Sequence, residues 1–189
     1  MTAQAPDYYR YHGKQYEIIA MTEVIEPDFE NYRFVFKAPS TACWRGHVCE
    51  YSIRRDKIYL YHLYACCKDD EYPVFNGVAP IKSKRRNMMV YKDLNLFMKY
   101  TGKIVLGRGF INKYYIHMGF QQAWAYEEVI ELVFENGLLV NTINHNEMVS
   151  RIREQYDNDP ELMDAYFDDM IKYINDCFSL DMDVKAWWI

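Results

Sequence analysis

The sequence predicts an α+β fold in which antiparallel β hairpins come first and two helices end the chain. Three observations carry this prediction. Tyrosine, which suits half-buried strand surfaces, occurs 18 times among the 189 residues. Apolar and polar residues alternate through much of residues 1–143, whereas apolar residues recur at helical spacing after residue 144. We expect the strands to form one or two packed sheets or a partly open barrel.

The length predicts a single domain spanning residues 1–189. Within it we expect a β-rich body over 1–143 and a helical C-terminal segment over 144–189. Residues 68–96 interrupt the strand pattern with an acidic patch, two prolines and the basic run 82–86. This stretch is predicted to be a long loop.

Turn residues divide the first part of the chain into hairpins. Tyrosines on both sides of His12-Gly13 predict the first hairpin, over residues 8–20. A second hairpin is predicted from the alternating residues 47–53 and 58–64, joined by the polar turn 54–57.

Two further strand regions follow from alternation. Tyr32, Phe34 and Phe36 alternate with more polar neighbours, which predicts a strand with one apolar face. Gly107-Arg108-Gly109 is predicted to be a hairpin turn between residues 100–106 and 110–117, because glycine adopts positive φ readily.

Residues 125–141 fit two structures. They could form a helix that Gly137 ends as a C-terminal cap. They could equally form a hairpin that turns at Asn136-Gly137. The valines, Phe134 and the Asn-Gly pair favour the hairpin.

Helix signals follow. Asn144 or Asn146 could cap a helix that runs through Gln155, and Asp159 could cap a second one with Pro160 at its first position. The second helix would carry an apolar stripe that must pack against the sheet or against a partner. The stripe comprises Leu162, Met163, Tyr166, Phe167, Met170, Ile171, Ile174, Cys177 and Phe178. The terminal Trp187-Trp188-Ile189 is also expected to dock.

The run TACWRGHVCEYSI, residues 41–53, gathers cysteine, histidine, tryptophan and arginine. If Ile53 pairs with Ile58, Cys49 lies opposite His62 and His47 opposite Tyr64. A Cys49–His62 pair could then provide a nucleophilic thiolate. The competing interpretation is a core strand with buried thiols, which fits the usual burial of free cysteine.

A metal site in this run fits less well. Zinc sites usually use cysteine pairs two to four residues apart, whereas Cys43 and Cys49 are separated by five residues. Cys66 and Cys67 are adjacent and would point to opposite faces of a strand. We therefore expect no metal and no other cofactor. Arg45 is expected to pack on Trp44 or to reach a carboxylate.

The charge is unevenly distributed. The net charge is −5, which argues against a dedicated nucleic-acid-binding protein. From residue 150 onward there are ten acidic residues against four basic ones. An acidic helical surface is suited to a partner protein with a basic surface. The candidate contact residues are Glu161, Asp164, Asp168 and Asp169.

The chain is expected to be cytoplasmic. The first ten residues, MTAQAPDYYR, lack the apolar core of a signal peptide, and no long apolar run predicts a membrane span. The five cysteines are then expected to be reduced.

The run STACWRGHVCEYSIRRDKIYL, together with the later YYIHMGF, resembles uncharacterised bacterial proteins with a WRG-type strand hairpin. These are associated with the immunity proteins of polymorphic and contact-dependent toxin systems. The resemblance implies a non-enzymatic inhibitor that blocks a toxin or enzyme by steric and electrostatic occlusion. The alternative is an enzyme, or a domain binding a metal or small ligand, with its site around His47, Cys49 and His62.

Overall fold

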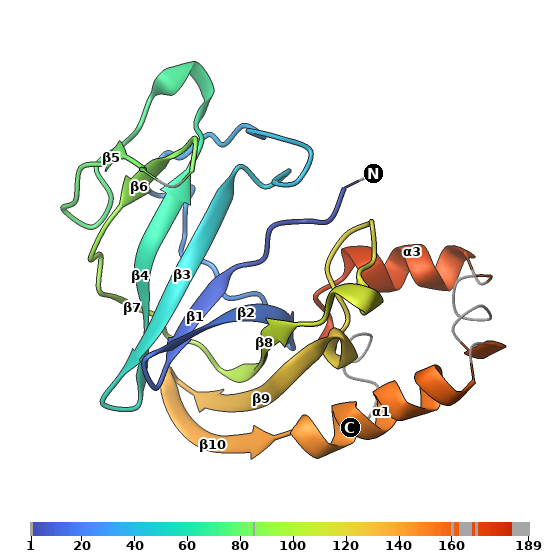
Figure 1. Ribbon diagram of the computed structural model, residues 1–189. Coiled ribbons are helices and arrows are strands. Elements are labelled where there is room, and N and C mark those ends of the chain that lie inside the picture. Colours follow the sequence, from blue (N-terminus) through green and yellow to red (C-terminus); the bar gives the residue numbers. More distant parts are fainter. Residues whose placement is uncertain (1, 85, 160, 163–167, 169, 183–189) are drawn as a thin grey trace.

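The computed structural model spans residues 1–189 and describes all of them except 1, 85, 160, 163–167, 169 and 183–189 (Figure 1). The strands are β1 Tyr8–Tyr11, β2 Lys14–Met21, β3 His47–Arg54, β4 Lys57–Ala65, β5 Ile81–Lys82, β6 Met89–Tyr91, β7 Leu96–Phe97, β8 Gly102–Phe110, β9 Tyr126–Glu135 and β10 Leu138–Asn144. The helices are α1 Asn146–Asn158 and α3 Met170–Phe178. Short 3-10 turns are η1 Lys68–Asp70, η2 Asn112–Tyr114 and η3 Ala123–Ala125.

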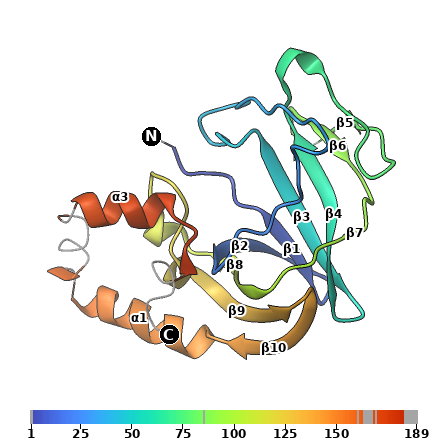
Figure 2. The same cartoon turned by 180° about the vertical axis from the view of Figure 1, so that it is seen from behind.

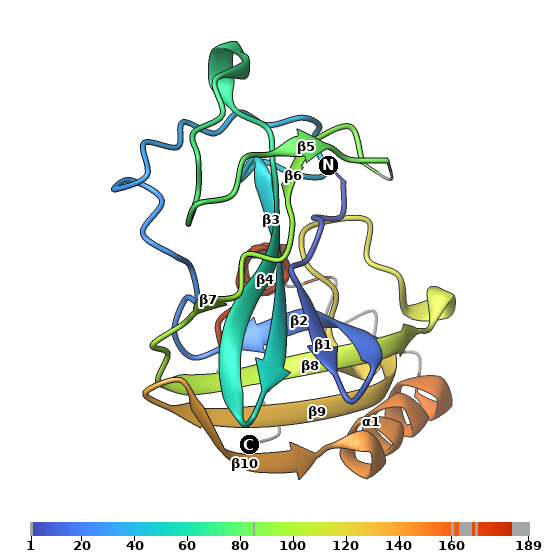
Figure 3. The same ribbon diagram turned by 90° about the vertical axis from the view of Figure 1, so that its left-hand side faces the viewer.

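The strands form a single bent sheet in the order β10-β9-β8-β2-β1-β3-β4-β6-β5, and β7 pairs with β4. Neighbours pair antiparallel except β1 and β3, which are parallel. The sheet curves until Leu138 of β10 pairs with Lys57 of β4. Figure 3 shows β8–β10 crossing steeply below β3 and β4. The predicted α+β fold with a partly open barrel is confirmed.

Two apolar cores support this sheet. The larger core lies between the two halves of the bent sheet and includes the buried rings of Tyr9, Tyr51 and Phe134. The smaller core lies on the other face of β8 and β9, where Val149 and Ile152 of α1 pack beside Trp124. Both helices lie at the β8–β10 half of the molecule (Figures 1 and 2).

Three predicted hairpins are confirmed. β1 and β2 turn at His12-Gly13, and β3 and β4 pair from Arg54–Lys57 outward. β9 and β10 turn at Asn136-Gly137, where φ is 49° and 83°. Positive φ at both central residues is the geometry that an Asn-Gly hairpin turn supplies, so the helix alternative for residues 125–141 is wrong.

The strand predicted at Tyr32–Phe36 is wrong. Only Phe36 makes a bridge, to Cys67, and Arg33 has a φ of 61° that interrupts the extended backbone. Phe34 and Phe36 instead stack at 5.2 Å between ring centroids and join the main core. The two rings alternate in sequence because both pack into the core at one end of the β3–β4 hairpin.

The predicted Gly107–Gly109 turn is also wrong, because β8 runs through it while paired with β9. A Cβ on Gly107 would lie 2.7 Å from the Tyr126 ring, so glycine here makes room for a cross-strand aromatic side chain. Gly109 has a φ of 73° and drops out of the register between Arg108 and Phe110. Residues 110–117 hold the short η2 turn rather than a returning strand.

The long stretch 68–96 contains η1 and the short strands β5 and β6, and it ends where β7 begins. α1 begins one residue after its cap position, which is His145 rather than Asn144 or Asn146. Asn144 Oδ1 instead accepts from the Asn146 backbone N–H at 2.8 Å. The Asn146 side chain accepts from the Val129 N–H at 2.7 Å and so ties the helix to β9.

Candidate functional site

The TACWRGHVCEYSI run is held by an ion pair between Arg45, which is 29% exposed, and the buried Asp7. Arg45 donates from Nη1 to Asp7 Oδ2 at 2.9 Å and from Nη2 to Oδ1 at 3.1 Å. The backbone N–H of Cys49 donates to the same Oδ1 at 2.8 Å. Burial alone would lower the pKa of Arg45, but the Asp7 carboxylate outweighs it and raises that pKa. The expectation that Arg45 reaches a carboxylate is confirmed, and the cluster fixes structure.

The predicted Cys49–His62 pair is wrong. Ile53 does pair with Ile58, but a bulge between Glu50 and Tyr51 shifts the register by one residue. Cys49 therefore lies opposite Leu63, and His47 lies opposite Ala65. His62 faces Glu50 instead.

Each of the three residues has its own surroundings. The Cys49 side chain is fully buried, and burial raises the pKa of its thiol well above the ordinary value. His47 lies 3.1 Å from Glu26 Oε1 through Nε2, which lowers the pKa of Glu26. Burial lowers the pKa of His62, whose Nδ1 accepts from the Asp93 N–H at 3.0 Å. Because its pKa is raised, the Cys49 thiol is a poor nucleophile.

The described residues contain no group of three or more His, Cys, Asp or Glu side chains arranged to hold a metal ion. In that part of the chain all five cysteines are buried and none forms a disulfide. The interpretation of this run as a core strand with buried thiols therefore describes the structure.

A different site lies on the outer face of β1, β3 and β4. Tyr8 pairs in register with Glu50 and with Glu17 of β2, so their side chains share the face that points away from the main core. A hollow of about 400 Å³ opens here and is called the outer hollow. Its lining consists of Tyr8, Arg10, Gln15, Glu50, Tyr64 and Arg86.

Arg10 and Arg86 both line the outer hollow, but their side chains have different partners. Arg10 is ion-paired through Nε with the buried Glu50 carboxylate and lies 5.0 Å from the Tyr61 ring. The guanidinium carbon of Arg86 lies 5.2 Å from the Tyr8 ring and 5.1 Å from the Tyr64 ring. In the described part of the chain no ion pair joins Arg86 to a carboxylate. The hollow thus holds two cations against one anion.

A smaller hollow of about 230 Å³ continues the groove past Tyr8 and Gln15. The Tyr126 hydroxyl donates to Glu17 Oε2 at 2.5 Å beneath it. Burial raises the pKa of Glu17, while the hydrogen bond from Tyr126 acts against that rise. The two hollows together form a polar groove across β8, β2, β1, β3 and β4.

The acidic residues predicted to bind a partner lie at the other end of the molecule. Glu161 and Asp168 are exposed, whereas Asp164 and Asp169 fall outside the described residues. Three apolar members of the predicted stripe are also exposed: Leu162 at 48%, Ile171 at 76% and Ile174 at 36%.

The end of the stripe is anchored. Cys177 is buried, and the Phe178 ring stacks on Trp44 with centroids 5.5 Å apart. The predicted docking of residues 187–189 falls outside the described residues.

No family model, curated protein or solved structure matches the chain. The resemblance to immunity proteins therefore stays a prediction. None of the helices in the described ranges is long and apolar enough to cross a membrane.

The outer hollow was missed at the level of sequence. Arg86 belongs to the basic run 82–86, which reads as a solvated loop. One local signal existed: Tyr8 and Arg10 alternate with Tyr9 and Tyr11, so a buried Tyr9 face requires Tyr8 and Arg10 to share the opposite face. Nothing local shows that Tyr64 and Arg86 complete this face.

Proposed function

We propose that the protein binds another protein and blocks it by steric and electrostatic occlusion, as an immunity-like inhibitor of a basic toxin domain or enzyme would. The observation that carries the proposal is the exposure of Leu162, Ile171 and Ile174 in the acidic C-terminal segment. The apolar stripe to which they belong needs cover, and these three residues do not find it on the sheet.

The physical argument combines burial with charge. Apolar side chains at the centre of an interface supply binding energy, and surrounding charges steer the encounter and select the partner. Glu161 and Asp168 lie next to this apolar surface in sequence, within a segment of ten acidic and four basic residues. The occupant that fits is a protein with a basic surface and an apolar centre. We place this interaction in the cytoplasm.

The test uses the untagged protein purified from its own host and native mass spectrometry. We expect a basic protein at fixed stoichiometry. The double variant Glu161→Lys/Asp168→Lys should weaken its binding at least about tenfold at low salt, because both steering charges are reversed. Ile171→Ser should weaken it as well, without a loss of stability, because Ile171 is 76% exposed.

The matched control is Glu30→Lys/Glu71→Lys, which makes the same change of charge at two exposed positions outside the C-terminal segment. If both double variants lower the affinity equally, only the net charge matters and the proposed surface is wrong. If neither variant nor Ile171→Ser changes the affinity, the partner binds elsewhere.

A further inference from the structure

The outer hollow has the features of a built anion site. Arg86 lies over two tyrosine rings, with its guanidinium carbon 5.2 Å from the centroid of Tyr8 and 5.1 Å from that of Tyr64. A guanidinium that lies on aromatic rings keeps its N–H groups directed outward along its edge. In the described residues these N–H groups have no carboxylate to bind.

The charges of the hollow favour a single negative charge. Arg10 is already neutralised by Glu50, whose carboxylate is 3% exposed. Arg86 adds a second positive charge to the same hollow, so one positive charge is left over. A carboxylate carries one negative charge and has two coplanar oxygens, which match the planar fork of a guanidinium.

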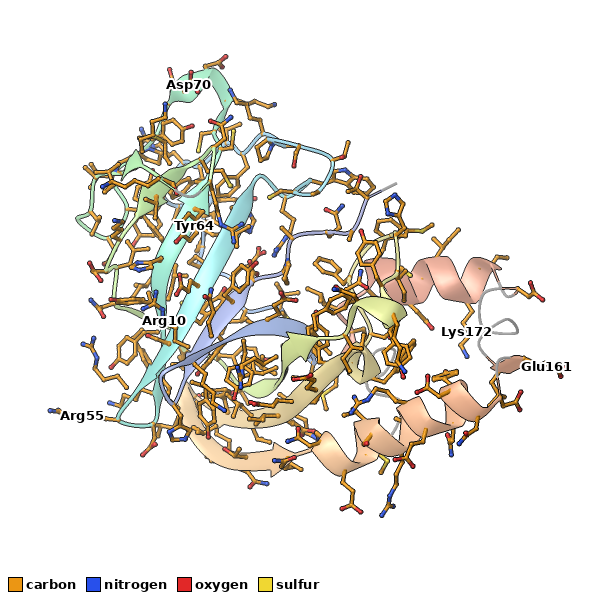
Figure 4. All side chains as sticks on the ribbon, in the orientation of Figure 1. Arg10, Arg55, Tyr64, Asp70, Glu161 and Lys172 are labelled. Atoms are coloured by element: carbon orange, nitrogen blue, oxygen red, sulfur yellow. The ribbon has the colours of Figure 1, made fainter. Side chains whose placement is uncertain are left out.

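We propose that the outer hollow binds a carboxylate group, with Arg86 as its principal ligand and Arg10 and Gln15 at its sides. The volume of about 400 Å³ accommodates a small organic acid or an acidic side chain of a polypeptide. This site is separate from the acidic surface of the proposed function. Figure 4 places Arg10 and Tyr64 on the β3–β4 side of the molecule, away from Glu161 and Lys172.

The experiment is an NMR titration of the arginine Nε–Hε signals in the full chain at constant ionic strength. The probes are glutarate, a blocked acidic tetrapeptide and inorganic phosphate. We expect saturable shifts of the Arg10 and Arg86 signals with the two carboxylate probes. If the tetrapeptide binds more tightly than glutarate, the natural ligand is an acidic side chain of a polypeptide. If glutarate binds more tightly, the natural ligand is a small organic acid.

Variants make the test specific. Arg86→Gln should weaken carboxylate binding about tenfold to a hundredfold, as expected for the loss of a charged hydrogen bond. Arg86→Lys keeps the charge but loses the planar fork, and it should also bind at least several-fold more weakly. Arg55→Gln is the matched control, because Arg55 is an exposed arginine at the tip of the β3–β4 hairpin (Figure 4).

Three results overturn the proposal. The first is the absence of saturable shifts at Arg86 with either carboxylate. The second is an equal loss of affinity in Arg55→Gln and Arg86→Gln, which indicates unspecific attraction. The third is tighter binding of phosphate than of both carboxylates, which assigns the hollow to a different anion.

Discussion

Arg45 and Arg86 both lie beside the sheet, but Arg45 is bound to a carboxylate and Arg86 to aromatic rings. Arg45 is half-buried and gives two guanidinium nitrogens to the buried Asp7, which also binds the Cys49 backbone. Arg86 lies on two tyrosine rings and faces an open hollow. The comparison teaches that an arginine paired with a buried carboxylate has a structural role, whereas an arginine held over aromatic rings keeps its N–H donors for a ligand.

The largest expected effect concerns the thiols around Arg45. Cys49 is fully buried, and burial raises the pKa of its thiol well above the ordinary value. In the folded protein we expect Cys49 to react with a disulfide reagent at least about a thousandfold more slowly than in the unfolded chain, because reaction requires opening. Labelling followed by mass spectrometry measures this. A rapidly labelled Cys49 in the folded protein would show that this run is a reactive site.

The second prediction concerns the ion pair between Arg45 and Asp7. Asp7→Ala removes the carboxylate that accepts from two nitrogens of Arg45 and from the Cys49 N–H. We expect a loss of about 3 kcal/mol in the free energy of unfolding, measured by urea denaturation. Glu147→Ala is the control, since Glu147 is exposed and pairs with the exposed Arg151 one turn further along α1. It should cost less than about 0.5 kcal/mol. Equal losses would remove the distinction between a fully paired site and an exposed one.

The third prediction concerns Arg108, which is paired with a carboxylate but is partly exposed. Arg108 donates to Glu128, which Tyr16 and Lys14 also contact. The hydrogen bond from Arg108 lowers the pKa of Glu128 from 4.5 to about 2. A lowered carboxyl pKa means that its stabilisation is present above about pH 4.5 and is lost as the pH falls towards 2.

Glu128→Gln should therefore cost about 1 kcal/mol at pH 7 and much less near pH 2, because the pair is partly solvated. Urea denaturation at several pH values measures the difference. Glu135→Gln, at an exposed position at the end of β9, is the control and should change stability little at any pH. A constant difference between Glu128→Gln and the unaltered protein across this pH range would contradict the assignment.

The hairpins could be predicted because each depends on a local turn and on alternation, as at Asn136-Gly137. The predictions that were wrong concern features that depend on contacts between distant segments. The bulge between Glu50 and Tyr51 separates Cys49 from His62. The alternation at Phe34 and Phe36 is real, yet it serves core packing rather than strand pairing.

The outer hollow shows the same limit. It joins β1, β4 and the 82–86 loop, which no spacing in the sequence connects. Gly107 is another case, because its role depends on the Tyr126 ring across the sheet. The acidic character of the C-terminal segment, by contrast, can be read directly from its composition.

The smallest expected effect is the stability change in Arg86→Gln. This variant removes two cation–π contacts at a partly exposed site, and we expect it to cost only about 0.5 kcal/mol. Paired with the loss of carboxylate binding, a small cost separates Arg86 from Arg45: one residue contributes to binding and the other to stability. Urea denaturation of Arg86→Gln beside Asp7→Ala tests this. If Arg86→Gln costs as much as Asp7→Ala, Arg86 is a structural residue, and its open edge no longer argues for a ligand.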